Sequence, residues 1–564
     1  MAKARGEGWA WPVCAVVLAL MCANLLSVVA RKSITADEVV LIPAGYQHLS
    51  ARDFQPINEH PPLAKLLAAL PLLCITPDAA QPEEATDASP LWGFWETRRG
   101  VFGRVSFWAR APAVLLTVAL GGLIFVFARE LFGARAAVLA VALYSLEPTV
   151  LAHGRVAQTD VPAAFGYLLV CYALYRYVPA PSWRRAAFLG LACGLALLAK
   201  FSMVLAVPVV GVTFAALLWR ARAGARATLA AHACVVALTA LLLVHAGYFF
   251  QRRPLGASDA QWFAEAFPAH AGTMFALARA LALVLPTEFV VGVFWQLQHN
   301  AAGHPASLLG MYGRTGWWYY FPVAFALKTT LPFLLLSLAA LAWAGYELCV
   351  RRERRFAVPL GAFALYTAFL MLSRIDIGVR YYLPAYPFLF MLGGALLARL
   401  LDARRVRRAA LAAVVALLVW TGAEAWRAYP DQMSYFNQLA ARRPHWQYLS
   451  DSNVEWGDDA RGLAEYLRAR GETQVRAAAL AAPYTLRYYG VEYVNLLPPD
   501  DAPLPETRYV AIGASYLNGS TVHEGRIRGR ALTEAERVNY FDAYRQRTPE
   551  AVIGGSIYLF RERE

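Results

Sequence analysis

About eleven long apolar stretches run through this sequence, and they restrict its possible folds more than any other feature. A helix needs about 20 mostly apolar residues to cross a membrane. The stretches lie at 9–30, 111–128, 135–152, 161–178, 186–199, 201–219, 228–249, 320–346, 356–373, 381–401 and 408–426. Apolar residues make up 58% of the 564-residue chain and charged residues only 16%, whereas soluble domains hold about 45–50% and about 25%. The sequence therefore predicts a polytopic α-helical membrane protein and excludes an ordinary soluble or disordered chain.

Basic residues occur in every second connection between these stretches. The basic connections lie at 1–8, 129–135, 184–185, 220–226, 351–355 and 404–408. Loops rich in Lys and Arg stay in the cytoplasm, so the N-terminus is predicted inside and, with an odd number of spans, the C-terminal part outside. This pattern accounts for the net charge of +14 without a nucleic-acid partner. The first stretch is too long for a signal-peptide core and is predicted to be a retained anchor.

The other connections gather polar residues on the outer face. They are a long loop at 31–110, a short one at 153–160, the junction at Lys200, a long loop at 250–319, a short one at 373–380 and a tail from 427. Within the long loops, 61–73 and 274–298 are predicted to form amphipathic or re-entrant helices at the membrane interface, broken by proline.

The tail is more polar than the rest of the chain. We expect a helix at 457–470, strands at 473–480 and 507–514, a helix at 532–547 and a strand at 552–561. This alternation predicts a small α/β domain, which divides the chain into a transmembrane module at 1–426 and an extracytoplasmic α/β domain at 427–564. The seven cysteines end at Cys349 and form no CxxC pair, so neither a disulfide framework nor a zinc cluster is indicated.

Charged residues cluster in the first outer loop. Asp37 and Glu38 follow the first apolar stretch directly, and acids at a membrane boundary cost solvation unless something uses them. The structural alternative is a solvated loop or a helix N-terminus, which favours acids. Glu59, His60 and Lys65 surround a proline-started helix in "INEHPPLAKLL" (57–67), a pattern that a plain surface helix also explains.

The next outer connections are equally rich in charge. "EPTVLAHGRVAQTDVPAA" (147–164) holds His153, Arg155 and Asp160 at the ends of two predicted spans. Such density at a bilayer surface indicates function, although an ion pair that fixes two helices together is the alternative. Lys200 separates two apolar runs, where it either binds an anion or extends to the interface.

Two later segments combine aromatic and basic side chains. The first, at 303–333, carries Arg314, Trp317, Trp318, Tyr319 and Tyr320. Aromatic faces pack on pyranose rings, so this run suits a sugar, and an interfacial aromatic belt is the alternative.

The second segment, "LSRIDIGVRYYLPAYPFLF" (372–390), holds Arg374, Asp376, Arg380 and Tyr381. Arginine matches phosphate through its forked donors, and an Arg–Asp structural pair is the alternative. Acids and phosphate-type cations thus converge on one membrane face, which suits the transfer of a head group from a lipid-linked anionic donor. The sequence contains neither a P-loop nor a dinucleotide-binding glycine motif.

At these residues the sequence resembles the C-type glycosyltransferases. It is similar to glycosyltransferase family 39 and its bacterial relatives, the protein O-mannosyltransferases and the lipid A aminoarabinose transferases. The matching pieces are Asp37-Glu38, "HPPLAK" (60–65), "HGRVAQTD" (153–160), "GWWYYFP" (316–322) and "RIDIGVRYYLPAYPF" (374–388). The tail segment 429–459 also resembles the bacterial branch, but residues 455–458 read Glu-Trp-Gly-Asp where that branch has Asp-Trp-Gly-Gln.

The resemblance implies an inverting transfer of a sugar from a polyprenyl-phosphate donor. Asp37 matches the catalytic aspartate, which acts as the general base, Glu38 would orient the acceptor, and Asp160 matches the second acidic position. The cations predicted to hold the leaving phosphate are Lys65, Lys200, Arg374 and Arg380. The predicted substrate-binding residues are Glu59, His60, His153, Arg155, Arg314, Trp317, Trp318, Tyr319, Tyr320 and Tyr381. This chemistry requires no cofactor and no metal, although two adjacent acids could bind a divalent ion.

The acceptor is left open by the sequence: lipid A, another envelope glycan or lipid, or Ser/Thr of exported proteins. The expected location is a bacterial inner membrane, with the site and the C-terminal domain in the periplasm. A transporter or flippase of a lipid-linked or anionic solute is the alternative function, and it predicts polar residues spread through the spans and a repeat. A non-catalytic scaffold is a third possibility, in which neutralising Asp37 changes only stability.

Overall fold

The computed structural model describes residues 8–75, 90–403, 405, 407–497, 507–522, 526–527 and 530–562. Lys3, Arg5 and Arg404, three of the predicted cytoplasmic basic residues, lie outside the described residues. The chain forms two compact units, each described here by itself. Unit 1 comprises 1–40, 79–156 and 303–564, and unit 2 comprises 41–78 and 157–302.

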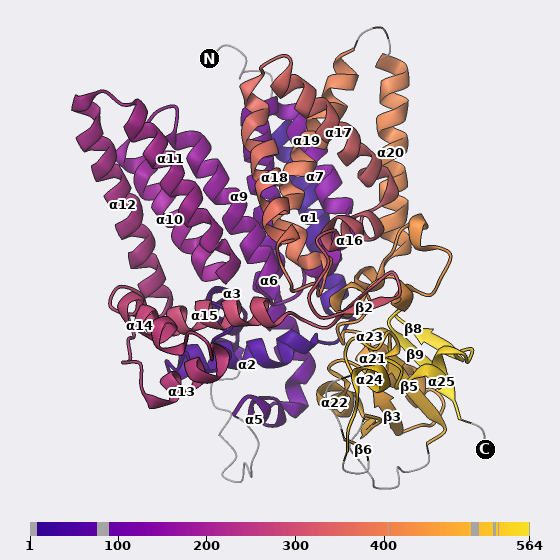
Figure 1. The fold of residues 1–564 in the computed structure, drawn as a ribbon. Helices are drawn as coiled ribbons and strands as arrows, with labels where there is room; N and C mark the ends of the chain where they lie inside the picture. Colours follow the sequence, from indigo (N-terminus) through magenta and orange to yellow (C-terminus); the bar gives the residue numbers. More distant parts are fainter. Residues whose placement is uncertain are drawn as a thin grey trace. The chain divides into compact units, whose positions relative to one another are not determined.

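The long helices of unit 1 form a bundle (Figure 1). They are α1 (Ala10–Val29), α6 (Phe102–Phe132), α7 (Ala134–Leu146), α17 (Leu331–Cys349), α18 (Ala357–Met371), α19 (Tyr386–Asp402) and α20 (Arg407–Arg427). Helix α19 lies at the centre, since almost all of its residues are buried. It approaches α7 closely at Gly394, where an added Cβ would overlap the carbonyl of Ala136. Small residues permit such close packing of membrane helices.

Two of the expected spans in this bundle are each broken into two helices. The stretch 135–152 forms α7 and α8 (Pro148–His153), and the stretch 320–346 forms α16 (Tyr320–Lys328) and α17. Proline stands in the first turn of α8 and of α17, where its missing N–H costs no hydrogen bond. The two breaks face each other, because Glu147 accepts a 3.0 Å hydrogen bond from the Thr330 hydroxyl and a 3.2 Å one from its N–H.

Shorter elements complete the helical part of unit 1. They are the start of α2 (Ala36–Ser50), α5 (Pro90–Glu96), η2 (Arg99–Val101), β1 (Ala306–Leu308), β2 (Met311–Gly313), η4 (Arg354–Phe356), η5 (Val379–Ala385), η7 (Gln432–Ser434), η8 (Gln438–Ala440), η9 (His445–Gln447) and η10 (Asp451–Asn453). Strands β1 and β2 form an antiparallel hairpin.

The tail folds into a five-stranded sheet with the order β4-β3-β5-β9-β8. Strand β3 (Gln474–Ala478) is parallel to β4 (Glu492–Asn495) and β5 (Tyr509–Gly513). Strands β9 (Ile557–Arg561) and β8 (Ala551–Ile553) join them in antiparallel fashion. The short elements around the sheet are α21 (Ala460–Arg468), α22 (Ala482–Thr485), η11 (Leu486–Tyr489), α23 (Ala514–Leu517), β6 (Arg526–Ile527), β7 (Arg530–Ala531), α24 (Glu534–Val538) and α25 (Asp542–Arg545).

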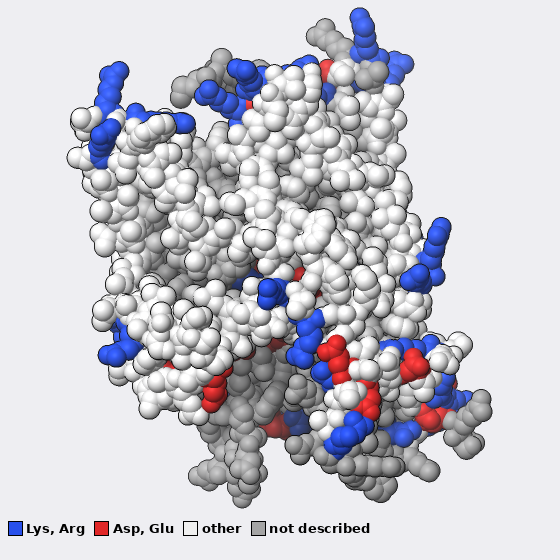
Figure 2. Space-filling view, in the orientation of Figure 1, with Lys and Arg blue, Asp and Glu red and all other residues white. Residues whose placement is uncertain are grey.

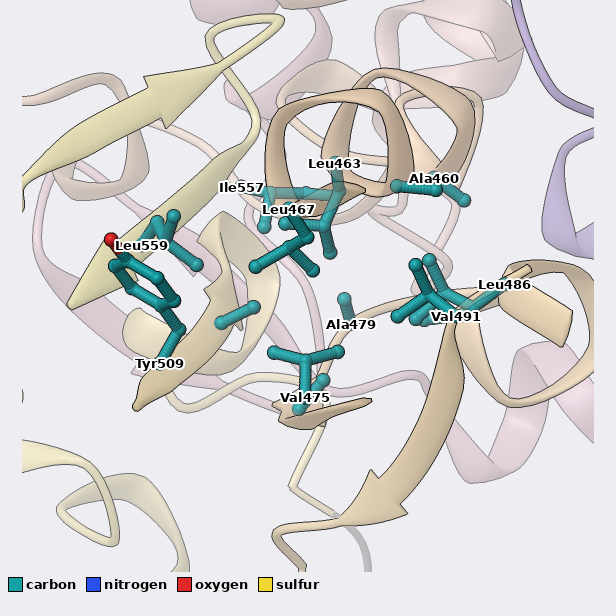
Figure 3. Packing of buried hydrophobic residues seen from close by; sticks show 14 residues of the cluster. Ala460, Leu463, Leu467, Val475, Ala479, Leu486, Val491, Tyr509, Ile557 and Leu559 are labelled. Carbon is teal, nitrogen blue, oxygen red and sulfur yellow. The ribbon is translucent and has the colours of Figure 1, made fainter. Parts of the chain in front are cut away.

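One face of this sheet packs on α21 (Figure 3). Leu463 and Leu467 of the helix meet Val475, Ile557 and Leu559 of the strands, and all five are fully buried. The small α/β fold of the tail is therefore confirmed. The expected helix at 532–547 is two short helices, the expected strand at 552–561 is a hairpin, and β4 was not expected. The division into a module at 1–426 and a domain at 427–564 stays a prediction, since the tail and the bundle share unit 1.

In its described residues, unit 2 contains helices joined by loops, and no strands. It contains the rest of α2, α3 (Leu63–Ala69), α4 (Leu72–Ile75), α9 (Asp160–Tyr177), α10 (Trp183–Ala199), η3 (Phe201–Leu205), α11 (Ala206–Arg220), α12 (Ala223–Gly247), α13 (Ala257–Ala266), α14 (Ala271–Leu281) and α15 (Thr287–Ala302). The chain breaks at Lys200 as expected, where the backbone is extended between α10 and η3. The amphipathic segments are interrupted where proline occurs, at Pro71 between α3 and α4 and at Pro286 between α14 and α15.

Each predicted apolar stretch coincides with helix. Within the described part of the chain, 7 helices have both the length and the composition to cross a membrane, fewer than the eleven stretches because several helices are short or interrupted. Figure 2 shows Lys and Arg side chains gathered over the loops that join α11 to α12 and α19 to α20. The chain is thus a multi-pass membrane protein.

Candidate active site

Asp37 and Arg380 form the ion pair at the centre of the unit 1 site. Asp37 lies in the first turn of α2, where acids are favourable, and Arg380 lies in η5. Arg380 Nη1 donates a 2.7 Å hydrogen bond to Asp37 Oδ2. The Asp37 side chain is 28% exposed and that of Arg380 only 7%, so the carboxylate is the accessible member of the pair. The sequence places these residues 343 positions apart, and the fold brings them together.

A tryptophan lies beneath this ion pair. The guanidinium carbon of Arg380 is 4.1 Å from the centre of the Trp456 ring, a cation–π contact. The Trp456 ring is buried and also meets the ring of His153 edge-on, with 5.8 Å between the centres. His153, one of the predicted substrate-binding residues, therefore supports the tryptophan from the end of α8.

Glu38, next to Asp37, is committed to structural contacts. Its two oxygens each accept a 2.9 Å hydrogen bond from Arg110 of α6. It also accepts a 2.8 Å bond from the N–H of Thr35, whose hydroxyl in turn accepts from the Glu38 N–H. This reciprocal pattern is a capping box at the start of α2. Glu38 thereby fixes the turn that presents Asp37.

Arg155 belongs to a second buried ion pair of unit 1. Its Nη2 donates a 2.5 Å hydrogen bond to Asp458 Oδ2, and neither side chain is exposed beyond 1%. Burial raises the pKa of Asp458, but the charges of Arg155 and Lys32 outweigh burial and the net pKa is lowered. Arg155 is therefore in an ion pair, but the pair joins the loop after α8 to the tail, whereas the structural alternative was an ion pair between two helices.

The aromatic run is only partly buried. Trp318 and Arg314 are exposed, whereas Tyr320 is fully buried. Tyr320 accepts a 2.9 Å hydrogen bond from the Asn453 side chain. Trp317 and Tyr319 are half-buried. The run therefore has an exposed edge, at Trp318, on which a ligand could pack.

The 372–380 segment lies against this run. Asp376 accepts a 2.6 Å hydrogen bond from the Trp317 N–H, and burial raises the pKa of Asp376 to about 7 although that hydrogen bond opposes the shift. Arg374 is exposed, and Tyr381 is half-buried with its ring 5.3 Å from the Arg380 guanidinium. The predicted residues Arg374, Arg380 and Tyr381 thus share one segment with Asp376.

Unit 2 holds the remaining predicted residues. Lys65 of α3 is 2% exposed and donates a 2.7 Å hydrogen bond to the Ile57 carbonyl. Burial lowers the pKa of Lys65 to about 7, and the charges of Glu59 and Glu288 oppose this shift. Glu59 and His60 are half-buried in the turn before α3. The cluster predicted around "NEHPPLAK" is therefore present.

Asp160 and Lys200 meet in the same unit. Asp160 begins α9, Lys200 occupies the break after α10, and the two side chains form an ion pair. Asp160 is 1% exposed, which makes it far less accessible than Asp37. Lys200 therefore pairs with an acid of its own unit, whereas the structural alternative was extension of the side chain to the interface.

Among the described residues, no group of three or more His, Cys, Asp or Glu side chains is arranged to hold a metal ion. The carboxylates of Asp37 and Glu38 are instead engaged by Arg380 and Arg110.

Part of the chain matches a known family. Residues 90–248 match the family model of the dolichyl-phosphate-mannose-protein mannosyltransferases. A comparison with curated proteins gave no significant match.

Solved structures resemble the chain over most of its length. The protein O-mannosyltransferase Pmt1–Pmt2 complex of S. cerevisiae, bound to its sugar donor, is 12% identical with a TM-score of 0.50, over 74% of this chain and 90% of that chain. This chain has the fold of a C-type glycosyltransferase. ArnT from Cupriavidus metallidurans, bound to undecaprenyl phosphate, is 15% identical with a TM-score of 0.47, over 98% of each chain. The Archaeoglobus fulgidus oligosaccharyltransferase is 15% identical with a TM-score of 0.46, over 86% and 64%.

The sequence did not indicate several residues that build the site of this C-type fold. Arg110 engages Glu38 from within α6, and Trp456 supports Arg380 from the tail. Asp451 lies close to the same arginine: burial raises the pKa of Asp451, and the Arg380 charge opposes the shift. The "EWGD" segment, which departs from the pattern of the bacterial branch, was the one available signal for Trp456.

Proposed function

We propose that the protein is a membrane glycosyltransferase that moves a sugar from a polyprenyl-phosphate donor to an extracytoplasmic acceptor. The observation that carries this proposal is the accessible carboxylate of Asp37, held by Arg380 at the start of α2. The fold and the match of 90–248 to mannosyltransferases that use dolichyl-phosphate-mannose support the same class of donor.

Asp37 acts as the general base in this proposal. It takes the proton of the acceptor group as that oxygen attacks the anomeric carbon, and the sugar inverts as polyprenyl phosphate leaves. A phosphate leaving group needs no proton, so a single base is sufficient. The base must be accessible to the acceptor, and of the predicted acids Asp37 is more exposed than Glu38 or Asp160.

Cations stabilise the phosphate as its negative charge grows. Arg380 is next to the base and presents a planar fork that suits phosphate oxygens. Lys65, Lys200 and Arg374 are the further candidates. The exposed edge at Trp318, with the exposed Arg314 one short turn earlier in the chain, is the proposed surface for sugar or acceptor.

The donor is proposed to be an undecaprenyl-type phosphate carrying a hexose or pentose, and the acceptor a lipid, a glycan or a protein hydroxyl. The membrane is proposed to be a bacterial inner membrane, and the positive-inside rule then puts the N-terminus in the cytoplasm. The site and the tail then face the periplasm.

The decisive experiment compares the wild-type protein with Asp37→Asn in detergent. Both receive a panel of polyprenyl-phosphate sugars and a membrane extract as the source of acceptor, and release of free polyprenyl phosphate is measured. We expect release by the wild type and a loss of about 100-fold or more in the variant. Asp402→Asn, which removes an acid from the exposed pair with Arg135, is the control and should release normally.

Equal release by wild type and Asp37→Asn would remove Asp37 as the base. A different result is a folded protein that releases no polyprenyl phosphate from any donor and yet moves labelled lipid across vesicle membranes. That result would contradict the enzyme proposal and support a flippase.

A further inference from the structure

We propose that Trp456 of the tail is a positioning residue that sets the geometry of both Asp37 and Arg380. The inference rests on the proposed function, because it assigns Trp456 a task in the same reaction. If Trp456 has this task, the extracytoplasmic tail takes part in catalysis through one side chain and the main chain next to it.

The ring of Trp456 acts on Arg380. Its centre is 4.1 Å from the guanidinium carbon, and the ring is 2% exposed. A buried aromatic face attracts a cation more strongly than an exposed one, so the contact fixes the plane of the guanidinium. With that plane fixed, Nη1 points at Asp37 Oδ2 at 2.7 Å.

The backbone of the same segment acts on the turn before Asp37. The Trp456 carbonyl accepts a 2.8 Å hydrogen bond from the Ala36 N–H, and the Asp458 carbonyl accepts a 2.8 Å bond from the Ser33 N–H. Ala36 is the first residue of α2 and precedes Asp37 directly. A single segment of the tail therefore contacts Arg380 through its ring and the turn that precedes Asp37 through its main chain.

The segment is itself held firmly. Glu455 accepts hydrogen bonds of 2.7 and 3.0 Å from the N–H groups of Leu480 and Ser515, at the ends of β3 and β5. Asp458 pairs with Arg155, and Asp459 pairs with Lys32. These contacts anchor the segment to the sheet on one side and to the bundle on the other.

The ring is held in an apolar pocket between these anchors. Ala152 and Val156 from the α8 region, Met433 and Ala36 pack around it. The tryptophan cannot move without displacing the sheet, α8 or the start of α2. Rigid support of this kind lets a catalytic group keep its productive geometry.

The test uses Trp456→Leu and Trp456→Phe, with Trp446→Leu as the matched control. Trp446 is a half-buried tryptophan of the tail whose ring also lies near an arginine, Arg545, at 5.8 Å. In the transfer assay we expect Trp456→Leu to lower kcat about 100-fold, the order of loss that misplacement by about 1 Å causes, while KM for the donor stays nearly constant. Trp456→Phe keeps an aromatic face and should recover most of the rate, and Trp446→Leu should match the wild type.

A second measurement does not depend on activity. Hydrogen exchange of the Ala36 amide should become faster in Trp456→Leu than in Trp446→Leu, at equal Tm, because the ring no longer holds the carbonyl that accepts from it. A normal kcat together with unchanged exchange of the Ala36 amide in Trp456→Leu would overturn the inference. It would also be overturned if Trp456→Leu and Trp456→Phe lost the same amount of kcat and the same amount of Tm.

The two proposals fail in different ways. An inactive wild type, or an active Asp37→Asn, contradicts the proposed function, and the exchange experiment still decides the role of Trp456. An Asp37-dependent wild type with an active Trp456→Leu contradicts the positioning role alone.

Discussion

Arg110 donates one 2.9 Å hydrogen bond to each carboxylate oxygen of Glu38, and neither side chain is exposed to solvent. The two adjacent acids of the first outer loop therefore have separate tasks. Glu38 maintains the start of α2, and Asp37, which is 28% exposed, remains accessible to a substrate.

This division predicts opposite phenotypes for the two acids. Glu38→Ala leaves the buried guanidinium of Arg110 without its carboxylate partner, although it still donates to the Lys32 and Ser33 carbonyls. Breaking such a buried ion pair costs about 3–5 kcal/mol, so thermal unfolding in detergent should occur at a clearly lower temperature. Asp37→Ala removes an accessible side chain and should leave the unfolding temperature within a few degrees of the wild type. A stable Glu38→Ala protein would contradict the structural assignment.

The buried lysine of α3 predicts a pH dependence for donor binding. Burial lowers the pKa of Lys65 to about 7, and only the protonated form attracts a phosphate. Above about pH 7, affinity for polyprenyl phosphate should therefore fall by up to about tenfold for each pH unit, since the lysine must take up a proton on binding. Calorimetric titration of the detergent-solubilised protein between pH 7 and 9 measures this slope.

Lys65→Arg supplies the control for that titration. Arginine stays charged throughout this range, so the variant should bind with a flat profile. A wild-type affinity that does not change between pH 7 and 9 would exclude Lys65 as a phosphate ligand.

Glu455 predicts how stability varies with pH. Burial raises its pKa from 4.5 to about 8, against two backbone hydrogen bonds that lower it. The folded protein therefore holds the proton more tightly than the unfolded chain, and the stability from protonated Glu455 is lost as pH rises from 4.5 through 8. Asp459, whose pKa burial raises to about 6, acts in the same direction at lower pH. Asp376 and Lys65, each with a pKa of about 7, also titrate between pH 6.5 and 8.5, so the contribution of Glu455 is the difference between two proteins. The free energy of unfolding should decrease less between these pH values in Glu455→Gln than in the wild type.

The Lys200–Asp160 pair predicts non-additive substitutions. Lys200→Met removes the cation that pairs with the buried Asp160 carboxylate and should destabilise the protein by about 3–5 kcal/mol. Adding Asp160→Asn should restore part of that loss, which thermal unfolding of the single and double variants measures. If Lys200 also binds donor phosphate, the stable double variant will show a raised KM for the donor; an unchanged KM assigns Lys200 to structure alone.

Local patterns in the sequence predicted the helices, the break at Lys200 and the proline breaks of the amphipathic segments, because hydropathy and proline act over a few residues. They did not predict the breaks at Glu147 and Thr330, which depend on a contact between them across 183 positions. The candidate residues Asp37 and Arg380 were found individually, and their pairing was not. Arg110 and Trp456 were missed as parts of the site because each lies in an apolar or tail segment whose partner is distant in the chain.

The backbone contacts between residues 33–36 and residues 456–458 link the site to the order in which the chain is made. A ribosome makes the loop that carries Asp37 long before the segment that carries Trp456. In the interval the growing chain therefore contains the proposed base without the support that orients it. In the proposed reaction, a chain that ends before Trp456 would lack the backbone contacts that support the turn before Asp37.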